Sequence, residues 1–143
     1  MKLKKSKRKI DYIVVHCTAT KEGRNHTAKE IDLWHKRLGW RGIGYNYVIQ
    51  LDGKIELGRD VDEIPSHAKG YNSNSIGVVY VGGVDINLKP KDTRTKEQKE
   101  ALLNLLKELK ILYPNAIIQG HRDFPKVAKA CPCFDAKKEY RGI

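Results

Sequence analysis

The chain has 143 residues, of which 40% are apolar and 31% are charged, so it has the size and composition of one globular domain. A fold of this length buries roughly 68–70% of the surface of its extended chain, so its core needs no disulfide framework. The net charge of +11 favours a polyanionic partner such as nucleic acid, a cell-wall polymer or a membrane surface. No apolar run approaches the ~18–20 residues of a membrane span.

Residues 1–9 contain six lysines and arginines and are predicted to form a basic N-terminal tail, followed by one domain over residues 10–143. The start has the charge of a signal peptide, but the apolar run after it is short and is interrupted by Asp11 and His16. We therefore expect no signal peptide, and a protein that accumulates in the cytoplasm of the cell that makes it. Because no aromatic residues are interleaved with the basic ones, a solvated tail is the simpler interpretation, ahead of a nucleic-acid site.

The first predicted elements are a strand over residues 10–17 and a helix over residues 27–38. The strand is rich in β-branched residues, and its alternation places His16 on one face and Cys17, as a buried thiol, on the other. A capping box begins the helix, and an apolar stripe follows at helical spacing. His35 lies on the inward face of this helix, where we expect a packed, hydrogen-bonded imidazole.

Residues 45–51 and 54–57 are predicted to pair as a hairpin around the turn Asp52-Gly53. Tyr45 and Tyr47 fall on one face of the first strand. One ring is therefore expected in the core, and the other hydroxyl in a site.

The sequence from residue 60 onward predicts a long loop, two strands and two helices. Residues 60–74 are irregular, and long loops inside compact domains are often functional. Strands are expected at residues 75–81 and 116–119, a leucine-striped helix with its own capping box at 95–112, and a short helix at 134–140. The fold class is therefore α/β, a single domain with a central mixed sheet of about five strands flanked by helices.

Two strand ends and one loop carry groups that bind transition metals. His16 and His121 each follow an apolar strand, and Cys131 and Cys133 follow His121. Two imidazoles and one thiolate would leave a fourth position open, which is the pattern of catalytic zinc. Spacing does not decide between the thiols, because Lys129, Cys131 and Cys133 all point to one side of an extended segment. A closed site with both thiolates and a chain without metal are the alternatives.

An ordered set of motifs now resembles one family. The chain resembles the zinc-dependent N-acetylmuramoyl-L-alanine amidases of type 2, which include amidase-type phage lysozymes and peptidoglycan recognition proteins. The motifs lie between about residues 10 and 140 and are Val15-His16-Cys17-Thr18-Ala19-Thr20, Trp34-His35-Lys36, Gly39-Trp40, Gly44-Tyr45-Asn46-Tyr47, Asp52-Gly53, Gly58-Arg59, Ser66-His67-Ala68-Lys69-Gly70-Tyr71-Asn72, Asn74-Ser75-Ile76-Gly77-Val78, Gly120-His121-Arg122-Asp123 and Lys129-Ala130-Cys131-Pro132. The short single-domain phage amidases are the most similar group, because a lysine precedes the Cys-Pro pair.

The resemblance implies one zinc ion per chain, held by His16, His121 and Cys131, and catalysis by Tyr45 and Lys129. It implies hydrolysis of the amide bond between N-acetylmuramic acid and L-alanine in bacterial peptidoglycan, as performed by a phage endolysin that acts on the cell wall after its release. The partner is then peptidoglycan, without a membrane span, and the chain is expected to be a monomer.

Further candidate site residues lie in the long loop and shortly after His121. We expect the long loop to hold stem peptide or glycan through His67, Lys69, Asn72 and Asn74. Asp123 would either orient a ligand imidazole or cap a turn. The alternative functions are a non-catalytic peptidoglycan-binding module and an additional role as a regulator that binds phage or host RNA polymerase, as phage relatives do.

Overall fold

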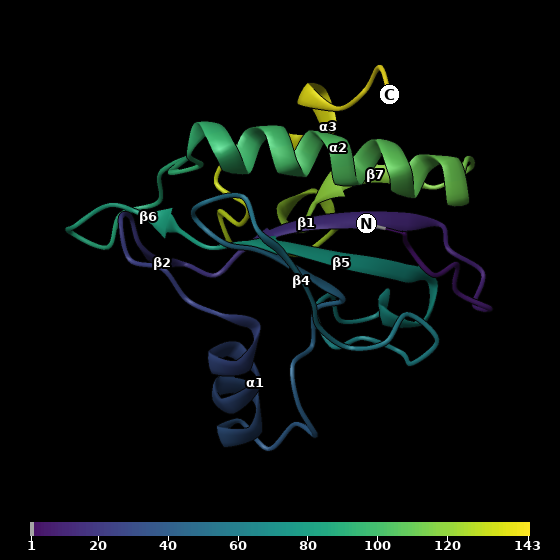
Figure 1. The fold of residues 1–143 in the computed structure, drawn as a ribbon, viewed down its shortest axis with the longest axis horizontal. Coiled ribbons are helices and arrows are strands. Elements are labelled where there is room, and N and C mark those ends of the chain that lie inside the picture. Colours follow the sequence, from purple (N-terminus) through teal and green to yellow (C-terminus); the bar gives the residue numbers. More distant parts are fainter. Residues whose placement is uncertain (1) are drawn as a thin grey trace.

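The computed structural model describes residues 2–143, and its centre is a five-stranded mixed sheet (Figure 1). The strand order is β4-β3-β5-β1-β7. The strands are β1 (Tyr12–Cys17), β3 (Tyr47–Ile49), β4 (Ile55–Leu57), β5 (Ser75–Tyr80) and β7 (Ile117–Gly120). β1 pairs in parallel with both β5 and β7, and β3 forms an antiparallel hairpin with β4. The predicted α/β class and its sheet of about five strands are confirmed.

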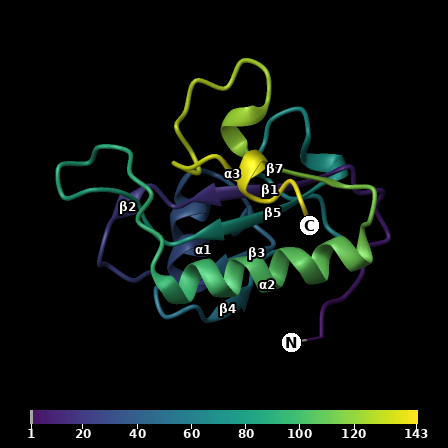
Figure 2. The same cartoon turned by 90° about the horizontal axis from the view of Figure 1, so that it is seen from above.

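Two helices cover opposite faces of the sheet, α1 (Ala28–Arg37) and α2 (Lys96–Leu112), as Figure 1 shows. Both begin at the predicted capping boxes, where the Thr27 and Thr95 hydroxyls each accept the backbone N–H three residues on. The last helix, α3 (Ala136–Glu139), is shorter than predicted and lies beside β7 (Figure 2). Among residues 2–143, no helix has both the length and the apolar composition that a membrane crossing requires.

The pleat of β1 separates the main core from the face that carries the site. Val15 and Cys17 point toward α2 and join the largest buried cluster, whose helical side is the leucine stripe of α2. Val14 packs on the other face, in a separate cluster with Ala68 and Phe124. His16 shares that second face with Val14 because side chains alternate along a strand. The prediction that Cys17 is a buried thiol is confirmed.

The region before β3 differs from the prediction. The strand begins at Tyr47 instead of residue 45, because the Asn46 side chain ties the chain to its neighbours: Asn46 Oδ1 accepts the N–H of Gly77 at 2.9 Å, and Nδ2 donates to the carbonyl of Arg59 at 3.0 Å. Tyr47 packs in the core beneath α2, and Tyr45 packs on the opposite face. The expectation that the two tyrosines share a face was therefore wrong, although one ring does lie in the core.

Short elements that depend on tertiary contacts were not predicted. A second, two-stranded sheet pairs β2 (Thr20–Lys21) with β6 (Gly83–Val84). Two 3-10 helices, η1 (Asn72–Asn74) and η2 (His121–Asp123), lie directly beside the strand ends. The second of them carries a predicted metal ligand.

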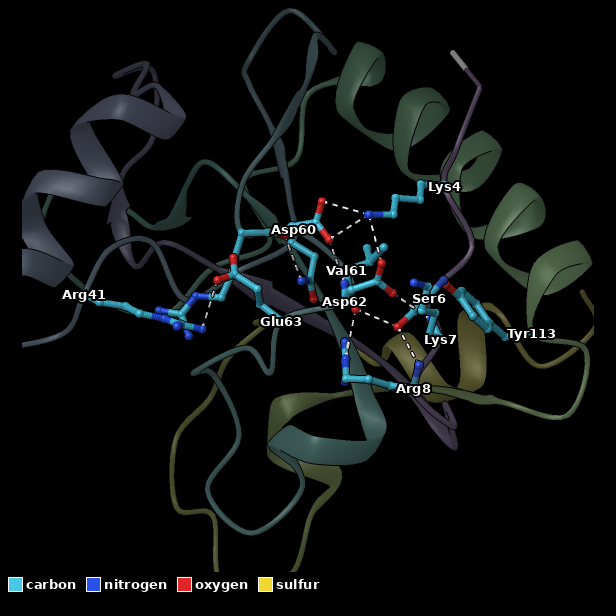
Figure 3. A network of polar contacts seen from close by, with 12 residues as sticks. Lys4, Ser6, Lys7, Arg8, Arg41, Asp60, Val61, Asp62, Glu63 and Tyr113 are labelled. Atoms are coloured by element: carbon cyan, nitrogen blue, oxygen red, sulfur yellow. Dashed lines mark hydrogen bonds and ion pairs between the residues drawn. The ribbon is translucent and has the colours of Figure 1, made fainter.

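The described part of the basic N-terminal segment packs on the domain (Figure 3). Ser6 is buried; its N–H donates to the Tyr113 hydroxyl and its hydroxyl donates to the Val61 carbonyl, both at 2.6 Å. Lys4 lies 2.9 Å from a carboxylate oxygen of Asp62. These residues are therefore held by specific contacts, in contrast to the solvated tail that composition alone favoured.

Candidate metal centre and active-site cleft

Three predicted metal ligands meet at one end of the sheet. His16 lies near the C-terminal end of β1, and His121 directly follows β7, its parallel neighbour. Cys131 comes from the loop after His121. One donor atom from each of the three residues lies within 4.8 Å of the others, and Cys131 Sγ is 3.7 Å from His16 Nδ1. The topology thus joins residues that are far apart in the chain.

Both imidazoles are held in the neutral form that metal binding needs. His16 is 1% exposed, and this burial lowers its pKa well below the ordinary value, with the nearby His67, His121 and Lys129 acting in the same direction. Burial also lowers the pKa of His121, and the Lys129 charge adds to the effect. A histidine binds a metal ion through an unprotonated nitrogen, so these shifts favour binding near neutral pH.

The surroundings distinguish the two thiols of the loop. Hydrogen bonding by the Cys17 thiol lowers the pKa of Cys131, and the Cys17 backbone N–H also donates to Cys131 Sγ at 3.2 Å. Burial raises the pKa of Cys133 to about 11. Donors directed at a sulfur stabilise its thiolate, which is the form that binds a metal. The electrostatics therefore favour Cys131 as the ligand.

The backbone around the two thiols forms a turn. The N–H of Cys133 donates to the Ala130 carbonyl at 2.7 Å, which closes a turn over this segment. Cys133 Sγ lies 3.8 Å from Cys17 Sγ. The expectation of an extended backbone over this segment was therefore wrong. Within residues 2–143, the donor cluster around Cys131 does not include Cys133.

His67 lies against the buried ligand. Its Nδ1 is 2.7 Å from His16 Nε2, and its Nε2 is 2.9 Å from Ser75 Oγ. Burial lowers the pKa of His67 to about 3, with His121 and Arg8 nearby acting in the same direction. Both ring nitrogens of this predicted substrate-binding residue are thus engaged within the protein.

An open cleft of about 610 Å³ adjoins the ligand cluster. It is lined by residues of the long loop and of the loop after β7, together with Trp40: Trp40, Ser66, His67, Ala68, Lys69, Asn72, His121, Lys126, Val127, Ala128 and Lys129. The cleft therefore contains three of the four loop residues predicted to bind substrate.

The loop residues have different surroundings. Lys69 is exposed at the cleft. Asn72 also shapes the loop, because its Oδ1 accepts the backbone N–H groups of His67 and Ala68 at 3.0 and 2.9 Å. Asn74 does not line the cleft; its Nδ2 donates to Asp11 at 3.1 Å, at the opposite end of β1 and β5 from His16.

The two predicted catalytic residues lie at the same centre. The Tyr45 ring centroid is 5.0 Å from that of His16. Burial raises the pKa of Tyr45, and the neighbouring Cys131 adds to this, so the hydroxyl keeps its proton and can donate it in a hydrogen bond. Lys129 lies on the exposed wall of the cleft beside His121. A neutral donor and a cation thus border the ligands.

Several residues of the site had no clear sequence signal. Ser75 and Gly77 lie on the face of β5 that His16 shares, but the near-continuous apolar run around them gave no basis for assigning faces.

Two further predictions can be compared with the structure. Asp123 Oδ2 accepts the N–H of Gly120 at 2.8 Å, which is the turn-capping alternative. His35 is hydrogen-bonded as expected, since its Nδ1 accepts the N–H of Gly44 at 2.8 Å.

Comparisons with known proteins find one family, both in sequence and in structure. A profile of the family described as N-acetylmuramoyl-L-alanine amidase matches residues 6–134. The endolysin of Klebsiella phage KP32 is 47% identical over 126 residues, covering 88% of this chain and 82% of that protein. Among solved structures, the N-acetylmuramoyl-L-alanine amidase LysC from Clostridium intestinale URNW matches with a TM-score of 0.77 at 28% identity, over 97% of this chain and 90% of LysC. Drosophila PGRP-LB matches with a TM-score of 0.73 at 25% identity, over 92% of this chain and 79% of its own.

Proposed function

Because this chain belongs to the N-acetylmuramoyl-L-alanine amidase family, we propose that it cleaves peptidoglycan with one zinc ion held by His16, His121 and Cys131. It is an amidase of the endolysin type, hydrolysing the bond between N-acetylmuramic acid and L-alanine. The observation that carries the zinc proposal is the convergence of three donor atoms within 4.8 Å of one another beside an open cleft.

The donor set fits zinc. Two neutral imidazoles and a thiolate are among its preferred ligands, and three protein ligands leave a position for substrate or water. When bound, zinc supplies Lewis-acid polarisation of the scissile carbonyl and activation of the attacking water.

The chain's own groups would then stabilise the charge that develops on the carbonyl oxygen. Tyr45 offers a protonated hydroxyl because burial raises its pKa, and Lys129 offers an ammonium group from the cleft wall. Donors already in place where charge develops stabilise the transition state more than the ground state. We propose Tyr45 and Lys129 as the catalytic residues on this basis.

For substrate binding we propose the cleft residues Lys69 and Asn72, which lie on the loop facing Lys129. The contacts of His67 support a different role, which is developed below. Asn74 is left out of this set because its side chain donates to Asp11 away from the cleft.

Digestion of purified cell wall tests the reaction. We expect the released material to carry new L-alanine amino termini without new reducing sugars. Lys129→Ala should lower the rate by ~10²–10³, the usual effect of removing one oxyanion donor. A non-catalytic binding module would instead sediment with the wall and release neither end group.

We propose that the protein acts on the wall once it has been released from the cell that makes it, as its endolysin relatives' name suggests. RNA polymerase as a further partner stays a prediction from resemblance, and none of the contacts described above favours it.

A further inference from the structure

We propose that His67 is a positioning residue, which fixes the tautomer and orientation of His16 so that His16 Nδ1 faces the metal. This inference rests on the zinc site proposed above. It assigns His67 a role inside the protein, in place of the substrate contact that the sequence predicted.

A continuous chain of polar contacts runs from Cys131 through the rings of His16 and His67 to Ser75. Cys131 Sγ is 3.7 Å from His16 Nδ1, and the opposite nitrogen, His16 Nε2, is 2.7 Å from His67 Nδ1. His67 Nε2 is in turn 2.9 Å from Ser75 Oγ. The two rings stand at 80° to each other with centroids 4.8 Å apart, so they meet edge to face.

Metal binding by His16 would determine which ring nitrogens of His16 and His67 carry a proton. A neutral imidazole has one N–H donor and one acceptor nitrogen. If Nδ1 of His16 binds the metal, its proton must reside on Nε2, which then donates to Nδ1 of His67. His67 consequently carries its own proton on Nε2 and donates it to the Ser75 hydroxyl. Without His67, the Nε2 proton of the buried His16 would lose this acceptor.

Two features hold the His67 ring in place. The Oδ1 atom of Asn72 accepts the backbone N–H groups of His67 and Ala68, which holds the backbone of the loop in place at His67. The ring lies over Gly77 of β5, where a Cβ atom would come within 3.0 Å of His67 Cγ. Ser75 and Gly77 share one face of β5, so the strand supplies both a hydrogen-bond partner and the space for the ring.

Partners of this kind affect metal affinity because they orient the ligand and select its tautomer, and losing one typically weakens binding by ~10–100-fold. We therefore expect His67→Phe, which keeps a ring but has no acceptor, to raise the zinc dissociation constant by about this factor. His67→Asn places a carbonyl oxygen near the position of Nδ1 and should restore most of the affinity. Ser75→Ala should give a smaller loss of zinc affinity, because it removes only the hydroxyl that contacts His67 Nε2.

The experiment is a zinc titration in competition with a chromophoric chelator, on the full-length parent and these variants. His26→Ala serves as the matched control, since it removes an imidazole that pairs with Glu30 at 3.0 Å, away from the cleft residues. Circular dichroism establishes that each variant is folded. A folded His67→Phe protein that binds zinc as tightly as the parent would overturn the inference.

A second measurement does not depend on any variant. Long-range ¹H–¹⁵N correlation spectra of the zinc-loaded parent should show the His16 proton on Nε2 and the His67 proton on Nε2. Zinc on Nε2 of His16 would refute the inference even if His67→Phe failed to fold. A parent that binds no zinc would instead refute the metal site itself, so the two failures can be told apart.

Discussion

Cys131 and Cys133 are separated by one residue, yet their thiols lie in different surroundings. Both sulfurs lie near Cys17, but Cys131 Sγ also receives the Cys17 N–H and is 3.7 Å from His16 Nδ1, whereas Cys133 lies outside the donor cluster. We therefore expect Cys131→Ser to lose the bound zinc and Cys133→Ser to retain one zinc per chain. Metal content after dialysis against zinc-free buffer measures this, and the reverse outcome would reassign the third ligand.

The half-buried His67, which borders the cleft, should make the stability of the zinc-free protein depend on pH. Its pKa is lowered to about 3 in the folded state, against an ordinary value of 6.5. As the pH falls from 6.5 toward 3, the unfolded chain binds a proton that folded His67 does not, so stability present above pH 6.5 is progressively lost. One such group contributes up to ~1.4 kcal/mol per pH unit.

This contribution should be missing from His67→Asn. Urea unfolding of the zinc-free parent and variant, at a series of pH values between neutral and mildly acidic, compares the two slopes. His16 titrates in both proteins and His67 lowers its pKa, so the difference between the curves reports His67 together with its effect on His16. Equal slopes would mean that folded His67 takes up its proton in the ordinary range.

The direction of a side chain could be predicted where the residue lies in a regular element. His16 could be placed because alternation along β1 separates it from Cys17. Cys131 and Cys133 could not be distinguished, because the chain turns between Ala130 and Cys133 instead of staying extended. No local sequence pattern indicates that Gly77 of β5 leaves space for the His67 ring, which comes from another loop.

At the scale of elements, the N-terminal segment is joined to the loop that forms one wall of the cleft. Arg8 Nη1 donates to the carbonyls of Asn72, Ser73 and Ser75 at 3.0–3.3 Å, and Arg8 Nε donates to that of Val61 at 2.9 Å. Figure 3 shows this side chain among the other contacts of the segment. We infer that residues 6–9 act as part of the domain, in line with a family match that begins at residue 6.

Arg8→Met should therefore destabilise the protein by ~1–3 kcal/mol, because it removes the donors to several partly buried carbonyls. Lys5→Met is the matched control, since it removes the same charge from an exposed position in the same segment. The free energies of unfolding in urea measure the difference. If both variants lose the same small amount, the segment contributes only charge.

The helices and strands show which elements could be predicted. Capping boxes at Thr27 and Thr95 are local signals, and α1 and α2 begin where they indicate. The pairing of β2 with β6 involves two residues from each strand, and it depends on the chain having already folded. The start of β3 was misplaced because hydrogen bonds from Asn46 to distant residues, rather than β propensity, decide it.

The proposed metal centre joins the two ends of the chain. His16 is 105 residues before His121 (121 − 16), and only the adjacency of β1 and β7 brings them together. Cys131 then ties the loop after β7 back to β1. A zinc ion bound here would connect that loop, which forms the second wall of the cleft, to the centre of the sheet.

Zinc should consequently stabilise the fold as well as serve the reaction. A ligand that binds the folded state alone adds ~2.7 kcal/mol when its free concentration is about 100 times its dissociation constant. We expect a chelator to lower the unfolding temperature of the parent in a calorimetric scan, and added zinc to restore it. Cys131→Ser should unfold at the same temperature with and without chelator, because it has lost a ligand. A parent that keeps its unfolding temperature and its full activity in chelator would show that the three residues meet for a reason other than zinc.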